Sequence, residues 1–350
     1  MESSSFDYLN SVKQAVVELD LDIRRINRLD SVEDPARILT RGFRKAGWAV
    51  EKKSGNPPLR LVSPDGTTEL KRQQGKVWRH PASTEMICKE KDLTRRLLEL
   101  KGVPVPRGMS FDEDALELAD AIRPAFGSSV VVKPSNAGGS AGVTVGVTDG
   151  VTFREAWNRA KSIRKPGRNI VVEEQVPGIE VRCYVVGQEV VSAILRVQPF
   201  VVGDGTTEIA QLIEGVANHR SANAWYDRAR PIPDEEFLAH YGLNLTSTPK
   251  DGEVVILNPF HLFQLGSVTV EVLDRLNPTI LRNAVRAVRA VPGLEVAAVD
   301  FLTEDFTAAG GKVIEMNTAP ALSQHLFPAF GDPRPVVQQI VKYYSESIGG

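Results

Sequence analysis

The sequence predicts a mixed α/β (α+β) protein built from more than one subdomain. Segments with the 3.6-residue apolar period of helices alternate along the chain with short runs in which apolar and polar residues alternate, as they do in strands. Pro and Gly residues mark turns between many of these runs, and we find no internal repeat or low-complexity tract. A length of 350 residues with 42% hydrophobic residues is enough for two or three domains or subdomains.

Composition and charge argue against several classes of partner. Lys and Arg number 42 against 44 Asp and Glu, so the net charge is -2, and neither sign forms a block of five or six. We therefore expect no nucleic acid and no membrane as a partner. The first residues lack the basic and apolar regions of a signal peptide, and Cys88 and Cys183 lack the spacing of a metal or redox site. These observations predict a cytoplasmic location with both thiols reduced.

The first 85 residues predict a small α/β module. Polar helices are expected near 9–28 and 35–46, and strands in WAVEKK and LRLVSP. A Pro-Asp-Gly turn follows within SPDGTTE. After this module of three or four strands, Leu93, Leu97 and Leu100 at i, i+4 and i+7 predict a helix over 91–101.

Residues 152–197 predict a helix followed by a β-hairpin. Thr152 and Glu155 match a T-x-x-E capping box at the start of the helix. Two strands that meet at Gly187 and Gln188 follow. The apolar stripe of the helix is Phe153, Ala156, Trp157 and Ala160. Period-two alternation in the first strand places Glu180, Arg182 and Tyr184 on one face, and Val181, Cys183 and Val185 on the other.

The rest of the chain continues the alternation. Ile209, Leu212, Ile213 and Val216 predict a helix after a turn at 203–205. Strands are expected near 252–258, 266–272, 296–302 and 312–317, with a helix near 278–291.

The stretch VVVKPSNAGGSAGVTVG raises the first functional question. Its strand delivers Lys133 to a loop of small residues, whose backbone N–H groups can turn toward an anion. The loop residues that matter most are Ser135, Gly138, Gly139, Ser140 and Gly142. The stretch matches neither a P-loop nor a dinucleotide fingerprint, because a strand follows it. Taken alone, it favours a flexible hairpin slightly over a phosphate site.

Two apolar strands, VAAVDFL and KVIEMN, carry a candidate metal site. Glu315 and Asn317 project from the same face of the second strand, while Ile314 and Met316 are expected in a core. Asp300 interrupts the apolar run of the first strand. Two carboxylates and an amide oxygen suit Mg²⁺. The alternative is that these side chains lie at exposed strand ends.

The stretch VVEEQVPGIE is the third candidate. Glu173 and Glu174 end a strand, and a turn brings Glu180 back seven residues later. Carboxylates beside extended backbone can bind an adenine edge and ribose hydroxyls. Glutamates at strand ends are, however, common on any surface.

Taken in order, these pieces resemble the ATP-grasp superfamily. The ordered set is Lys91, KPSNAGGSAG, VVEEQVPGIEVR, VD and EMNTAP, and the similarity spans roughly residues 82–345. The resemblance is strongest to the ATP-grasp part of cyanophycin synthetase and to D-alanine:D-alanine ligases. It implies an ATP-grasp fold with ATP held between two α+β subdomains. The implied division is a small N-terminal α/β domain over 1–85, a central lid subdomain over 86–178, and a C-terminal subdomain with the metal site over 179–350.

The resemblance also implies a role for each candidate residue. Lys91 and Lys133 would contact the ATP phosphates, with the loop from Ser135 to Gly142 closing over them. Glu173 would lie at the adenine and Glu180 would bind the ribose, while the backbone of Glu174 and Val176 would hold the adenine edge. Asp300, Glu315 and Asn317 would hold two Mg²⁺ ions, with Mn²⁺ as the alternative.

The implied reaction joins a carboxylate to an amine at the expense of ATP, through an acyl phosphate. Catalysis would be positioning and charge stabilisation by Lys133 and an arginine, for which Arg196 is the first candidate and Arg182 the second. The substrates would be small molecules, namely amino acids or peptides, and dimerisation is common in the family. The alternatives are a kinase that releases a phosphorylated product and a nucleotide-binding protein without turnover.

The chain departs from the family pattern around the expected substrate site. Cyanophycin synthetase has an arginine followed by an Asn-Leu-Ser-Thr-Gly-Gly run, where this chain has Asn258 followed by PFHLFQLGS. Ala321 stands where the relatives usually have a glycine. With no Mur-ligase-like domain in the 350 residues, a single ligation is expected in place of cyanophycin polymerisation. The polar residues expected to line the acceptor pocket, or else to be structural, are His261, Gln264, Gln324 and His325.

Overall fold

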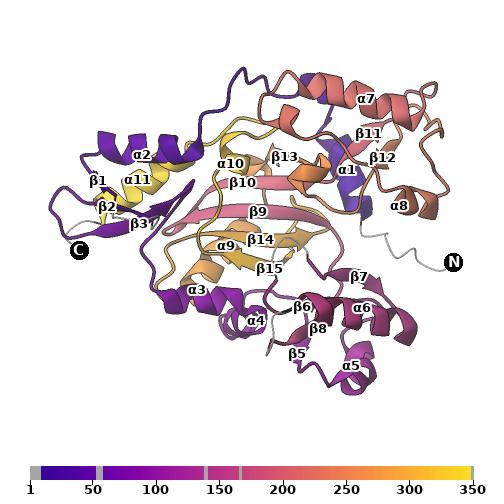
Figure 1. Ribbon diagram of the computed structural model, residues 1–350, viewed down its shortest axis with the longest axis horizontal. Coiled ribbons are helices and arrows are strands. Elements are labelled where there is room, and N and C mark those ends of the chain that lie inside the picture. The colour runs from indigo at the N-terminus through magenta and orange to yellow at the C-terminus, as the bar shows by residue number, and fades with distance from the viewer. Residues whose placement is uncertain (1–8, 53–57, 138–140, 165–167, 348–350) are drawn as a thin grey trace.

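The computed structural model describes residues 9–52, 58–137, 141–164 and 168–347 (Figure 1). Its largest element is a five-stranded antiparallel sheet in the order β13-β10-β9-β14-β15, here called the main sheet. Its strands are β9 (Ile179–Val186), β10 (Glu189–Val197), β13 (Val268–Glu271), β14 (Val296–Thr303) and β15 (Lys312–Asn317). All five overlap the strands expected from the sequence, and Gly187 lies at the predicted hairpin between β9 and β10.

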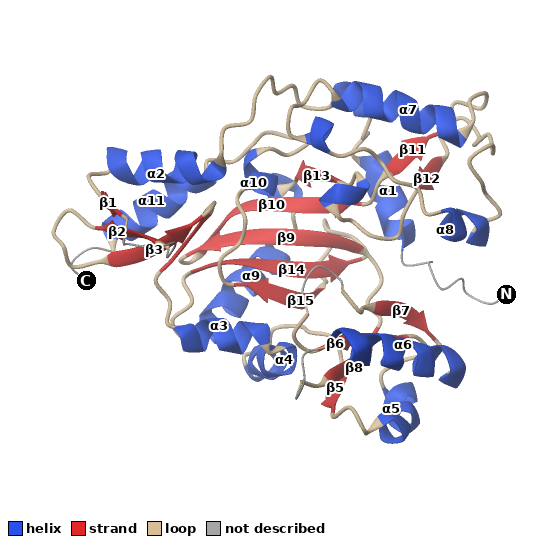
Figure 2. Ribbon diagram, in the orientation of Figure 1, coloured by secondary structure: helices blue, strands red, loops and turns tan. Residues whose placement is uncertain are grey.

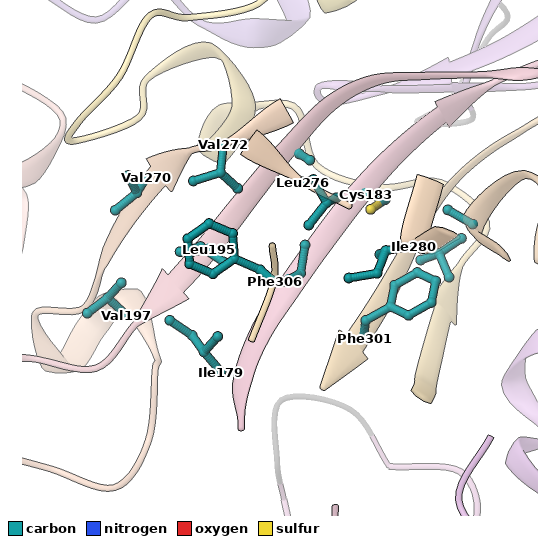
Figure 3. Close-up of a cluster of buried hydrophobic side chains, with 14 of the residues drawn as sticks. Ile179, Cys183, Leu195, Val197, Val270, Val272, Leu276, Ile280, Phe301 and Phe306 are labelled. Atoms are coloured by element: carbon teal, nitrogen blue, oxygen red, sulfur yellow. The ribbon is translucent and has the colours of Figure 1, made fainter. Parts of the chain in front are cut away.

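One face of the main sheet builds the principal core. Val181, Cys183 and Val185 are buried there, as the alternation in β9 predicts. Two helices pack on this face, α9 (Pro278–Ala290) and α1 (Asn10–Glu18). Figure 3 shows Cys183, Leu195 and Phe301 from three strands gathered with Ile280 of α9. The opposite face carries polar residues of the same strands at one end, while Tyr184, Val186 and Val296 pack into a second core at the other.

A second antiparallel sheet has the order β5-β8-β6-β7 and is here called the small sheet. Its strands are β5 (Gly108–Phe111), β6 (Val130–Pro134), β7 (Thr144–Val147) and β8 (Ile170–Glu174). Helix α6 (Gly150–Ile163) covers one face, with α5 (Leu116–Ile122) beside it. The stripe expected for α6 is buried in the core of this sheet, which is separate from the principal core. Figure 2 shows the small sheet next to the β15 edge of the main sheet.

The start of α6 differs from the prediction. The helix begins at Gly150, and the side chain of Asp149 accepts hydrogen bonds from the backbone N–H groups of Val151 and Thr152. Thr152 therefore lies inside the first turn, and the capping box predicted for it and Glu155 is wrong. Asp149 is the better N-cap because its carboxylate satisfies two free N–H groups at once.

The N-terminal module contains a four-stranded sheet in the order β1-β2-β3-β4, as expected. The strands are β1 (Ala49–Glu51), β2 (Leu59–Val62), β3 (Glu69–Gln73) and β4 (Lys76–Trp78). The predicted second helix is α2 (Pro35–Lys45), which packs against α11 (Val336–Glu346) near the other end of the chain. The expected first helix stops early because Asp20 has a φ of 51°, so only a short 3-10 turn follows at Ile23–Arg25.

The other elements complete the molecule around the two larger sheets. Helices α3 (Ala82–Lys89) and α4 (Lys91–Leu100) run along the β15 edge and α9, and α4 matches its predicted range. The elements on the far side are β11 (Phe200–Val202), α7 (Ile209–Arg220), α8 (Glu235–His240) and β12 (Val254–Ile256), with α10 (Ser323–Leu326) over β10. Across the described residues, no helix combines the length and apolar character needed to cross a membrane.

Candidate active site

A cleft of about 350 Å³ lies between the small sheet and the polar face of the main sheet. Strands β6 and β7 line one side, residues 173–178 close the back, and β9, β10 and β15 line the other side together with residues 259–262. A larger hollow of about 790 Å³ lies beyond 174–177 and is lined by only two of the predicted site residues, Glu174 and Val176. The first cleft gathers ten of them, so we locate the site there.

Charged side chains cross the cleft face of the main sheet in rows. Antiparallel pairing sets Asp300 opposite Arg182 and Arg196 opposite Glu180. Arg182 donates from Nε and Nη2 to Asp300 at 2.7 and 2.6 Å. Arg196 Nη1 donates to Glu180 Oε1 at 2.6 Å. Two buried carboxylates therefore each hold an arginine at the cleft, as fork-shaped guanidinium groups favour.

Burial and charge act in opposite directions on these two carboxyls. Burial would raise the pKa of Glu180, but the charges of Arg196 and His261 outweigh it and hold this pKa well below the usual range. For Asp300, burial is the larger effect and raises its pKa despite the contact with Arg182. An additional cation beside Asp300 would therefore stabilise the ionised form of its carboxyl group.

The predicted metal ligands lie side by side at the end of β14 and β15. Asp300 is paired in register with Glu315, and Asn317 Nδ2 lies 3.2 Å from Asp300 Oδ2. A β-bulge between Asp300 and Phe301 makes Ile314 the extra residue of β15. Ile314 therefore lines the cleft, and the prediction that it lies in the core is wrong; Met316 is buried in the principal core as expected.

These side chains fit a magnesium site by their chemistry. No three His, Cys, Asp or Glu side chains in the described ranges are arranged to hold a metal ion by themselves. The set is instead two carboxylates and one amide, which leaves ligand positions for phosphate and water oxygens. Mg²⁺ is bound in this way in many phosphate-using sites, because it keeps several waters and few protein ligands. Asp300, Glu315 and Asn317 would hold it here.

Two lysines enter the cleft from different elements. Lys133 at the end of β6 forms a buried ion pair with Glu173 of the neighbouring strand β8. Lys91 at the start of α4 donates from Nζ to the backbone oxygen of Ala137 at 2.9 Å, and its Nζ lies 3.6 Å from Glu315 Oε1. Burial lowers the pKa of Lys91. Both ammonium groups are therefore close to the loop that the sequence suggests for phosphates.

The described part of that loop has unsatisfied polar atoms. Ser135 Oγ and Asn136 Oδ1 are buried and make no hydrogen bond to any described residue. Buried polar atoms of this kind call for a partner, and a bound ligand or water would provide one. Gly142 is described with a φ of 72°, whereas Gly138, Gly139 and Ser140 lie outside the described residues.

Residues 173–178 connect the small sheet to the main sheet. Glu173 and Glu174 are both buried, and Glu174 is held by Arg107 at 2.7 Å and by Lys312. Val176 lines the cleft, where its backbone remains a candidate for an adenine edge. Arg107 and Lys312 were not among the predicted residues. Both are basic residues at or just before the start of a strand, and nothing in the sequence indicates that their partner is Glu174.

The candidates for an acceptor pocket separate into two groups. His261 lines the cleft, with its Nε2 2.9 Å from Glu180 Oε2. Gln264 is exposed outside it. His325 is fully buried beside Ser192, 2.7 Å from its Oγ, and does not line the cleft. Gln198, which was not among the predicted residues, lines the cleft, and its buried Oε1 has no hydrogen-bond partner among the described residues.

The fold and the site define a protein with the ATP-grasp fold. In structure, the chain matches a bifunctional glutathione synthetase from Pasteurella multocida with a TM-score of 0.61 and 24% identity, over 89% of this chain and 44% of that one. Residues 97–206 match the family model of the D-ala D-ala ligase C-terminus. The predicted ATP-grasp fold of the chain is confirmed by the match in structure.

Sequence relatives refine this placement. Cyanophycin synthetase of Trichormus variabilis is 30% identical over 268 residues, which are 73% of this chain and 29% of that protein. The glutathione biosynthesis bifunctional protein of Clostridium perfringens is 25% identical over 286 residues, 78% of this chain and 36% of that protein. The chain thus spans only about a third of the length of each of these two relatives.

Proposed function

We propose that the protein is an ATP-dependent ligase that joins a carboxylate to an amine. The observation that carries the proposal is the cleft itself. It brings two lysines, two arginines and an oxygen-ligand set together between two sheets, with no serine or cysteine nucleophile among the described lining residues. Such a site can position and neutralise phosphates but offers no side chain for covalent catalysis. The synthetase name of the first relative and the ligase name of the matching family model support the same class.

The reaction would proceed in two displacements. An oxygen of the substrate carboxylate attacks the γ-phosphorus of ATP, the bond from that phosphorus to ADP breaks, and an acyl phosphate forms. An amine then attacks the acyl carbon, inorganic phosphate leaves, and the amine loses a proton. Mg²⁺, when bound, would neutralise phosphate charge. Lys133 and Arg196 would stabilise the charge that develops on the transferred group, with Arg182 holding Asp300 in place.

The cleft suggests where each part of the nucleotide lies. Its apolar side, with Val131, Val145 and Ile314, suits adenine, and the ionic row at Asp300 suits the phosphates. Glu180 lies between these two regions: its register partner on β14 is Leu302, and Arg182, two residues further along β9, is paired with Asp300 in the ionic row. We therefore assign Glu180 to the ribose. The remaining polar residues of the lining, near Gln198 and His261, would contact the amino acid or peptide substrate.

This arrangement also supports the expected division into an N-terminal module, a lid subdomain and a metal-bearing subdomain. The separate core of the small sheet is consistent with a unit that moves against the main sheet. Dimerisation and the cytoplasmic location stay predictions.

The test is a screen for phosphate release from ATP and Mg²⁺ with amino acids and dipeptides, followed by mass spectrometry of the product. A ligase requires both a carboxylate and an amine and yields an amide. A stable phosphorylated product formed without an amine would instead indicate a kinase.

Arg196→Ala is the first variant to compare in that assay. Losing one stabilising donor should slow turnover by about 10²- to 10³-fold. Arg230→Ala is a matched control, because Arg230 is exposed and does not line the cleft. Equal activity of Arg196→Ala and the unchanged chain would rule out its catalytic role.

A further inference from the structure

Residues 258–262 form a fixed rim of the cleft. The side chain oxygen of Asn258 accepts a hydrogen bond from the backbone N–H of Phe260 at 3.1 Å, which makes a tight Asx turn. The preceding residue, Leu257, donates its N–H to the backbone oxygen of Pro199 at 2.8 Å. The rim is thus attached to the chain that leaves β10, and His261 follows the turn into the cleft.

His261 and Arg196 hold Glu180 from two sides. Arg196 Nη1 lies 2.6 Å from Oε1 of the carboxylate, and His261 Nε2 lies 2.9 Å from Oε2. The side chain of Glu180 is only 7% exposed, whereas that of His261 is 22% exposed. A buried carboxylate with one donor on each oxygen has little freedom to rotate. Its remaining lone pairs face the cleft in one defined orientation.

We propose that His261 is a positioning residue that sets the specificity of the cleft for a ribonucleotide over a deoxyribonucleotide. This rests on the proposed function, in which Glu180 accepts hydrogen bonds from the ribose. A carboxylate fixed by His261 accepts from the 2′-hydroxyl, and a deoxynucleotide leaves that acceptor unpaired. A site built to bind a hydroxyl discriminates strongly against the analogue that lacks it. Without His261, Oε2 is free to turn away from the sugar.

The test compares the dissociation constants of ATP and 2′-deoxy-ATP, each with Mg²⁺, by calorimetry on the full chain. The unchanged protein should prefer ATP by about tenfold or more. His261→Ala should reduce the preference to about twofold or less, and His261→Gln should recover part of it, because its amide can donate to Oε2. Gln264→Ala is the matched control, since Gln264 lies in the same segment, is exposed and does not line the cleft.

The outcomes separate the two proposals. If His261→Ala weakens both nucleotides equally and keeps their ratio, the specificity role of His261 is overturned, while nucleotide binding and the ligase proposal stand. If the unchanged protein prefers neither nucleotide, the role is overturned as well. Failure of the unchanged protein to bind either nucleotide would overturn both proposals. Should the alanine variant fail to fold, His261→Phe takes its place, because it keeps an aromatic ring but has no donor for Oε2.

Discussion

At the scale of single residues, two histidines of the same chain have opposite environments. His261 lies at the cleft with a carboxylate partner, whereas His325 is fully buried against Ser192. The ring of His325 packs edge-on against that of Tyr184, with the two ring centroids 5.1 Å apart. Burial is the main cause that lowers the pKa of His325 to about 3. The imidazole is therefore neutral in the folded protein across the physiological range. Its Nε2, which has no partner within the described part of the chain, adds to the cost of charging it.

We expect His325 to make the protein less stable in mild acid. Below the unfolded pKa of 6.5, the unfolded chain binds a proton that the folded protein does not, so stability falls as the pH decreases from 6.5 toward 3. Between pH 7.5 and 5 this should remove about 2 kcal/mol from the free energy of unfolding. Urea titrations of the unchanged protein and His325→Asn at both pH values measure the effect. Equal pH dependence in the two proteins would contradict it.

The sequence predicted the residue types of the site better than their partners. Lys133, Arg196, Asp300, Glu315 and Asn317 all gather around one cleft, because their spacing along strands fixes which face they occupy. The pairing of charges was not predictable, since partners such as Arg182 and Asp300 are 118 residues apart. Nor did the sequence distinguish the histidine in the cleft from the one in the core.

At the scale of elements, α6 begins with a cap that can be tested directly. Asp149→Ala removes the acceptor of two backbone N–H groups and should lower the free energy of unfolding by about 1 kcal/mol. Thr152→Ala, which removes only a hydroxyl at 3.2 Å from a backbone oxygen, should cost less than half as much. Denaturant unfolding of the two variants gives the comparison. If Thr152→Ala lowered the free energy of unfolding more than Asp149→Ala, the predicted capping box of Thr152 and Glu155 would be supported instead.

Elements with a long apolar pattern were predicted well, whereas some of the short ones were missed. Helices α2, α4 and α9 lie close to their expected ranges. Strands β5 and β11 have four and three residues, too few for a period-two pattern to show. The bulge in β15 was missed for another reason: an extra residue is defined only by the partner strand, and a single strand shows a regular alternation through it.

At the scale of the whole molecule, the cleft lies between two sheets that have separate cores. A nucleotide that contacts both sheets should stabilise the entire fold. A non-hydrolysable ATP analogue with Mg²⁺, at about a hundred times its Kd, should raise the Tm by about 5 °C. Glu315→Ala should reduce the shift, because it removes a metal ligand. Thermal unfolding checks this, and a shift that is unaffected by removal of Mg²⁺ would contradict the metal assignment.

The contacts of Lys91 have a consequence for how the cleft opens. One ammonium group is shared between the carbonyl of Ala137, in the loop after β6, and the carboxylate of Glu315 in the main sheet. The Lys91 side chain thus connects the loop after β6 to the main sheet. An anion bound in the cleft would compete for the same ammonium, and would thereby release the carbonyl of Ala137 and the carboxylate of Glu315 together. Entry of the ligand and preparation of the metal ligands would then be a single event rather than two.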